Sequence, residues 1–185
     1  MIVNADIRSA EAIKRLIGID YPSVAEIGCF KGDMSRRLLY RLGLHLMMVD
    51  PWGGIESSEE YLASGDPMAS MTKDEWQKVM HEAYNNVQWA EDRVRVFQGS
   101  SVQAANELDE RFDMVFIDGD HSYKATSEDI EAWWPKLAGG GWLGGHDYRT
   151  DKNFGVIQAV NEFAEENDLE LELGGNYTWW IHKNG

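Results

Sequence analysis

Acidic and imidazole side chains follow two apolar runs of this sequence. Asp118 and His121 come directly after the run that begins at Phe112, and His146 and Asp147 come after the glycine-rich run around Trp142. The carboxyl ends of adjacent parallel strands open onto the same edge of a sheet, so we expect these side chains to meet there. Carboxylates and imidazoles at such an edge can share a cation.

A second group of polar residues occurs earlier in the chain. Glu26, Gly28 and Gly32 belong to a loop that follows a short apolar strand, and its glycines allow a bound molecule to approach the backbone. The spacing is not Gly-x-Gly-x-x-Gly, and the bulky Phe30 argues against a dinucleotide. Asp50 ends the next strand, where its carboxylate can accept hydrogen bonds from two ribose hydroxyls and repel a phosphate.

Hydrophobic periodicity indicates which elements position these residues. Apolar segments that alternate with helical patterns predict a doubly wound α/β fold, with a mostly parallel sheet of seven strands and an antiparallel hairpin at the end. We expect one domain over residues 1–185, with an insertion or lid at about 53–92. The strands are expected at 23–28, 45–50, 93–98, 113–118, 142–145, 169–173 and 177–182, and the helices at 10–17, 32–42, 73–89, 102–108, 127–137 and 155–166.

Composition restricts the partners. The chain has 185 residues, 43% of them hydrophobic, and a net charge of −15, so polyanionic nucleic acids and membrane surfaces are unfavourable partners. The single cysteine, Cys29, excludes an internal disulfide and suits a reducing compartment. The first six residues lack the pattern of a signal peptide, and no apolar stretch reaches eighteen residues. We expect a cytoplasmic protein, and a homodimer stays open.

These segments together resemble class I S-adenosylmethionine-dependent methyltransferases with a Rossmann-like fold. The chain is most similar to the small-molecule O-methyltransferase branch, which has an Asp-Gly-x-His-x-Tyr segment on strand four and a Gly-Gly segment leading to a His/Glu-Asp pair on strand five. The similarity extends over 23–182, and the insertion at 53–92 matches poorly. The segments that carry it are 24–33, 49–52, 98–101 and 116–123.

The resemblance implies roles for individual residues. S-adenosylmethionine would be the cofactor, with its ribose on Asp50, its adenine beside Trp52, and its base edge near Ser100 or Ser101. The residues expected around its methionine part are Glu26, Gly28 and Gly32, and Lys31 and Asp118 are also expected to bind the cofactor.

The resemblance also implies a divalent metal held by Asp118, His146 and Asp147. Relatives usually have Glu-Asp or Asp-Asn at the last two positions, so the softer His146 would accept Mn²⁺, Fe²⁺ or Zn²⁺ as readily as Mg²⁺. We favour His121, beside Asp118, as the general base, with His146 as the alternative if it is not a ligand.

Several residues also have plain structural explanations. Asp120 and Ser122 can cap the following helix. Trp133, Trp142, Trp179 and Trp180 are expected in the core, with one residue of each adjacent tryptophan pair facing outward.

The function expected from these features is methylation of a hydroxyl on a small molecule, such as a sugar or natural-product-like acceptor, with a divalent metal assisting. The insertion, which contains Met68, Met71, Trp76, Met80 and Trp89, is either a lid over the acceptor or a packed helical hairpin. Three alternatives stay open: a metal-dependent hydrolase, a non-catalytic module that binds S-adenosylmethionine or a nucleoside, and a nucleic-acid methylase.

Overall fold

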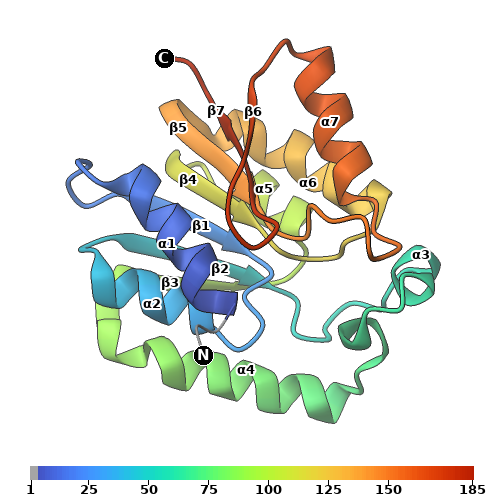
Figure 1. Cartoon of the computed structure of the whole chain (residues 1–185). Coiled ribbons are helices and arrows are strands. Elements are labelled where there is room, and N and C mark those ends of the chain that lie inside the picture. The colour runs from blue at the N-terminus through green and yellow to red at the C-terminus, as the bar shows by residue number, and fades with distance from the viewer. Residues whose placement is uncertain (1–3) are drawn as a thin grey trace.

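A twisted seven-stranded sheet forms the centre of the molecule (Figure 1). The computed structural model describes residues 4–185, with side chains from Ile7 onward. The strand order is β3-β2-β1-β4-β5-β7-β6, in which β7 runs antiparallel to both of its neighbours and every other pairing is parallel. The expected doubly wound fold with a closing hairpin is confirmed. The strands are β1 Ser23–Ile27, β2 His45–Asp50, β3 Val94–Gln98, β4 Phe112–Ile117, β5 Leu137–Gly145, β6 Leu171–Leu173 and β7 Trp179–His182.

Helices cover both faces of this sheet (Figure 1). On one face lie α1 (Asn4–Leu16), α2 (Asp33–Arg41) and α4 (Lys73–Val87). On the other lie α5 (Ser101–Glu107), α6 (Tyr123–Trp133) and α7 (Val156–Glu166). The chain changes direction along the sheet between β1 and β4, and this is where a doubly wound fold places its ligand.

The core consists of two apolar layers, one on each side of the sheet. Alternate residues of a strand enter opposite layers, so Met114 and Phe116 of β4 join one layer while Val115 and Ile117 join the other. The same alternation corrects one prediction: Trp179 and Trp180 are both fully buried. They lie on opposite faces of β7, which has a strand on each side and a core layer on each face.

Several element boundaries differ from the prediction, among them the starts of α1, α6 and β5. Helix α6 begins at Tyr123 instead of residue 127, because Ser122 caps it by accepting a hydrogen bond from the amide of Ala125 (3.3 Å). Strand β5 begins at Leu137 instead of residue 142, since Leu137 pairs with Phe112 of β4, and a register shift separates this pair from the next one, Met114 with Trp142. The earlier start of α6 places its first turn directly after the polar run at the end of β4.

The segment 53–92 has two halves with different roles. Its second half is mainly α4, which opens with a capping box between Thr72 and Glu75 and buries Val79, Ala83 and Val87 on one face. Its first half contains the short helix α3 (Glu59–Ala63) and a 3-10 turn at Pro67–Ser70. The packed-helix interpretation therefore holds for α4, and only the first half is available as a lid.

None of the described helices is long and apolar enough to cross a membrane. The expected absence of a signal peptide concerns residues 1–6, and the first three of these lie outside the part of the chain that the structure describes.

Candidate active site

A cavity of about 610 Å³ opens at the carboxyl ends of β1, β2, β4 and β5. Its lining includes the loop after β1, the end of β2 at Asp50, the start of α5 and the polar run after β4. The first half of the insertion forms a further wall through Ile55, Tyr61 and Met68. The cavity therefore connects the glycine loop with the acidic and imidazole side chains at the other strand ends.

The glycine loop is shaped by close backbone contacts. Gly28 has a φ of 81°, and a Cβ at this position would lie 2.2 Å from the carbonyl oxygen of Asp118. Lys31 lines the cavity and pairs with Glu82 at 2.9 Å. Gly32 is not among the described residues that line the cavity. It is the N-cap of α2 and has a φ of 71°, and a Cβ at this position would lie 3.3 Å from the backbone of Ala83. Gly32 thus allows α2 to pack closely against α4, and its contact with the cofactor stays a prediction.

Asp50 holds two turns in place at the end of β2. Its carboxylate accepts hydrogen bonds from the amides of Phe30 (2.9 Å) and Trp52 (2.7 Å). Burial raises the pKa of Asp50 to about 6, although these backbone hydrogen bonds oppose the shift. The residue still lines the cavity, so the strand-end cap and the ribose acceptor suggested by the sequence are compatible roles.

Glu26 lies behind the glycine loop and is 3% exposed. Burial raises its pKa to about 8, while a hydrogen bond from Ser35 (2.6 Å) works in the opposite direction. The side chain lines the cavity, and its raised pKa keeps the carboxyl largely protonated near neutral pH.

The side chain of Trp52 packs in the core. Its indole is 3% exposed, donates from Nε1 to the carbonyl of Phe30 (2.8 Å) and belongs to the core layer that contains α2 and α4. Among the described residues that line the cavity, its neighbours Pro51 and Gly53 are present and Trp52 is absent. The turn after Asp50 therefore directs the ring into the core, and contact of Trp52 with an adenine stays a prediction.

Ser100 and Ser101 line the cavity where α5 begins. Ser100 caps α5, and Ser101 accepts a hydrogen bond from Nε1 of Trp133 (2.8 Å). Asp129 of α6 hydrogen-bonds with Ser101 and is 6% exposed; burial raises its pKa to about 7. Sequence reasoning missed Asp129, although a lone acid on the apolar face of a helix was a usable signal.

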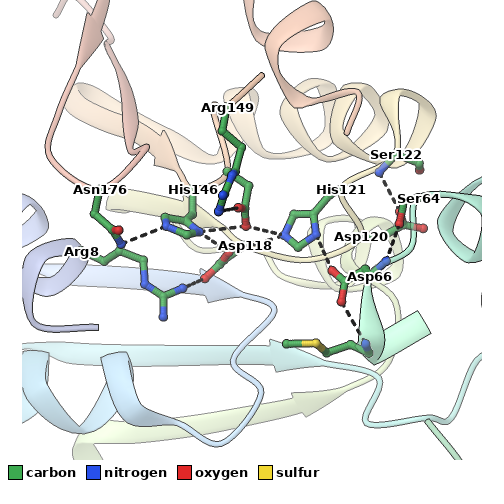
Figure 2. A network of polar contacts seen from close by, with 12 residues as sticks. Arg8, Ser64, Asp66, Asp118, Asp120, His121, Ser122, His146, Arg149 and Asn176 are labelled. Carbon is green, nitrogen blue, oxygen red and sulfur yellow. Dashed lines mark hydrogen bonds and ion pairs between the residues drawn. The ribbon is translucent and has the colours of Figure 1, made fainter. Parts of the chain in front are cut away.

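Two imidazoles and two carboxylates meet at the ends of β4 and β5 (Figure 2). Nε2 of His121 lies 3.0 Å from Oδ2 of Asp147 and 3.7 Å from Oδ1 of Asp118. Nδ1 of His146 lies 2.9 Å from Oδ2 of Asp147 and 3.4 Å from Oδ1 of Asp118. The structure thus brings together all four residues that the sequence placed at this edge.

The cluster strongly perturbs its own protonation. Burial alone would raise the pKa values of Asp118 and Asp147. Arg8 and the two imidazoles lower the pKa of Asp118, and the two imidazoles lower that of Asp147, both to well below the usual range. Burial disfavours the charged form of the imidazoles, yet the neighbouring carboxylates raise the pKa of His146 to about 9 and that of His121 well above its ordinary value. The four groups therefore form a charged network that contains compensating pairs.

Three of these residues offer ligand atoms to one cation. Atoms of Asp118, His121 and Asp147 all lie within 4.8 Å of one another. Nε2 of His121 is buried and has no hydrogen-bond partner of good geometry among the described residues, as expected for an atom that receives a ligand. The residues present therefore fit a divalent ion. The imidazole in this group is His121, whereas the sequence had assigned His146; His146 instead directs Nε2 toward Asn176 at 3.2 Å.

Two further residues reach the cluster from distant parts of the chain. Arg8 of α1 forms an ion pair with Asp118, and Asp66 of the insertion forms a 2.8 Å hydrogen bond with Nδ1 of His121 (Figure 2). Neither belongs to a recognisable motif, so sequence reasoning missed both. Their positions depend on how α1 and the insertion fold over the strand ends.

Comparisons with known proteins bear on the family and the fold of the chain. A family model described as a methyltransferase domain matches residues 25–148, and no curated protein sequence matches the chain. The solved structure of the O-methyltransferase NovP is similar with a TM-score of 0.67 at 15% identity, over 96% of this chain and 78% of NovP. The calicheamicin methyltransferase CalS11 gives 0.69 at 12% identity, over 95% and 77%. A Clostridium thermocellum protein provisionally named an rRNA methylase gives 0.67 at 13%, over 96% and 95%. At these identities the structural likenesses show a shared fold.

Proposed function

Because the chain belongs to the methyltransferase-domain family, we propose that it transfers the methyl group of S-adenosylmethionine to a hydroxyl group of a small molecule, with a divalent cation assisting. The observation that carries the proposal is the single cavity that joins two sets of residues. One set, around Gly28 and Asp50, suits the cofactor. The other, around Asp118 and Asp147, suits a hydroxyl acceptor.

The two sets fit the requirements of methyl transfer. The reaction is an in-line displacement, so the enzyme must hold the donor carbon and the acceptor oxygen about 3 Å apart and aligned. Gly28 lies against the backbone of Asp118, which brings the cofactor loop and the acceptor group to adjacent strand ends. A rigid sheet edge of this kind supports alignment better than a mobile loop does.

Asp118, His121 and Asp147 would hold the cation, which when bound lowers the pKa of a coordinated hydroxyl. His146 also lines the cavity but lies outside this group, so in this proposal it replaces His121 as the residue that receives the proton of the acceptor. A cation held by Asp118 and Asp147 would oppose the positive charge of His146 and lower its pKa, which would leave the neutral imidazole to accept that proton. Asp147 contacts both imidazoles and keeps them at the strand ends.

The cofactor part of the proposal is tested by calorimetric titration with S-adenosylhomocysteine, with and without Mn²⁺. We expect saturable binding to the protein as it stands. Absence of binding at millimolar ligand would refute it, and would favour a cation-dependent hydrolase that uses the acidic and imidazole residues alone.

The cation part is tested separately with the Asp147→Ala variant. Because Asp147 belongs to the acceptor side of the cavity, the variant should lose cation-dependent methyl transfer and keep its affinity for S-adenosylhomocysteine within about threefold. A large loss of S-adenosylhomocysteine binding would contradict the division of the cavity into two sets.

A further inference from the structure

The first half of the insertion buries few apolar side chains against the rest of the molecule. Helix α3 buries none of its side chains. Asp66, which follows it, is nevertheless only 8% exposed. A buried carboxylate in a segment with so little apolar burial needs an explanation, because burying a charge without partners is costly.

Both oxygens of this carboxylate have a defined partner. Oδ1 accepts a hydrogen bond from the amide of Met68 (2.9 Å) and so caps the turn Pro67–Ser70. Oδ2 lies 2.8 Å from Nδ1 of His121. The cap uses only one oxygen, so capping does not explain why the second is directed at an imidazole in the cavity.

The ring of His121 is fixed from three sides. It stacks on Phe154, with ring centroids 4.6 Å apart and planes 24° apart, and Tyr61 of the insertion meets it edge-on at 6.3 Å. Stacking on Phe154 sets the plane of the ring but leaves open a half-turn about its Cβ–Cγ bond, which would exchange the two edges of the ring. The hydrogen bond to Asp66 removes this freedom. Since an ionised carboxylate only accepts, Nδ1 must donate.

The opposite ring nitrogen is thereby aimed at the cation group. Nε2 faces Oδ2 of Asp147 at 3.0 Å and Oδ1 of Asp118 at 3.7 Å. It is buried and has no hydrogen-bond partner of good geometry within the described chain. A carboxylate on one nitrogen of an imidazole fixes the orientation of the other nitrogen and strengthens it as a ligand.

We propose that Asp66 is a positioning residue: by accepting the Nδ1 hydrogen of His121 it orients Nε2 toward Asp118 and Asp147, and it thereby makes cation binding depend on closure of the segment 57–70 over the cavity. The inference rests on the cation-assisted function proposed above and assigns a role to the insertion. The insertion and the cation group then stabilise each other, because each provides one half of the same hydrogen bond.

The Asp66→Asn variant separates this role from capping. An asparagine side chain has one acceptor and one donor group, so it can accept from the amide of Met68 or from Nδ1 of His121 but not from both. Glu59→Gln is the matched control, since it removes the same charge from the same segment at an exposed position outside the described lining of the cavity.

Mn²⁺ titration of the full chain provides the first measurement. Asp118→Asn defines the signal that belongs to this site and not to the acidic surface. We expect Asp66→Asn to weaken Mn²⁺ binding by about 10- to 100-fold and Glu59→Gln to stay within about twofold of wild type. Equal affinity in Asp66→Asn and wild type would overturn the proposal, as would a wild-type protein that binds no Mn²⁺ at the site.

Amide hydrogen exchange provides the second measurement, independent of catalysis. Protection of residues 57–70 should fall in Asp66→Asn and also in His121→Phe, while the strands keep their protection. A segment that exchanges equally in wild type and in both variants would contradict the coupling. Binding of S-adenosylhomocysteine is measured in parallel, so failure of the proposed methyl donor is distinguished from failure of the role of Asp66.

Discussion

At the scale of the residue, buried acids in this chain differ in charge according to their partners. Asp118 and Asp147 lie beside Arg8 or the two imidazoles and have lowered pKa values. Asp129 has a hydroxyl partner in Ser101 and acidic neighbours in Asp120 and Glu128, and burial raises its pKa from 3.8 to about 7. Between these values the folded state keeps a proton that the unfolded chain has released. Folding free energy therefore becomes less favourable as pH rises from about 4 to about 7 and then levels off.

Asp129→Asn removes this titration. The difference between the two pKa values of Asp129 corresponds to at most about 4 kcal/mol of folding free energy. The variant should therefore be more stable than wild type at pH 8 and close to it in stability at pH 4. Urea unfolding of both proteins at the two pH values measures the effect. An identical difference at pH 4 and pH 8 would show that Asp129 does not titrate in this range.

Arg8 gives a second prediction for a single residue. Its guanidinium pairs with Asp118, and both side chains are largely shielded from water, so it repels any cation held by that carboxylate. Arg8→Gln should strengthen Mn²⁺ binding by about tenfold and lower stability through loss of the ion pair. Arg15→Gln is the control, because Arg15 of the same helix pairs with Glu11 and Glu172 outside the cavity. Equal Mn²⁺ affinity in Arg8→Gln and wild type would contradict the prediction.

At the scale of the element, the contact between β1 and β4 is the tightest point of the site. Gly28→Ala would place a methyl group 2.2 Å from the backbone of Asp118. Gly140 has nearly the same φ, 82° against 81°, but nothing lies within 4 Å of an added Cβ. Gly140→Ala should therefore cost only the strain of a left-handed alanine, about 1 kcal/mol.

Gly28→Ala should cost several kcal/mol more than this control, and it should also weaken S-adenosylhomocysteine binding, because the loop and β4 must separate. Thermal unfolding and calorimetry measure the two effects. A pair of variants with equal stability would mean that the strand ends can separate without cost.

The helices and strands also show how much of the fold and of the site could be predicted from the sequence. Alternation and periodicity predicted every strand and the six helices that cover the sheet, because each has a repeating apolar face. Motif spacing placed Asp50 and Asp118 at their strand ends. It did not place Trp52, whose direction depends on one turn, or distinguish His121 from His146, which depends on side-chain rotation. Asp66 was unpredictable because the insertion has no periodic pattern before α4.

At the scale of the whole molecule, charge is concentrated where the ligand is expected. The chain carries a net charge of −15, and acidic side chains outnumber Arg and Lys around the cavity. The acidic lining residues are Glu26, Asp33, Asp50, Glu56, Glu60, Asp66, Asp118, Asp120, Glu128, Asp129 and Asp147, and the lysines and arginine are Arg8, Lys31 and Lys124. The negative electrostatic potential of such a lining attracts cations and disfavours polyanionic acceptors such as RNA.

This field should distinguish the methyl donor from its product. S-adenosylmethionine carries one positive charge more than S-adenosylhomocysteine and otherwise differs by one methyl group, so salt should screen the attraction of the donor more than that of the product. Between about 20 mM and 500 mM NaCl we expect S-adenosylmethionine to lose about three- to tenfold more affinity than S-adenosylhomocysteine. Calorimetric titrations of both ligands across this range provide the measurement. Parallel salt dependences would mean that the acidic lining is neutralised before the donor binds, and that the charge of the molecule does not favour release of the product.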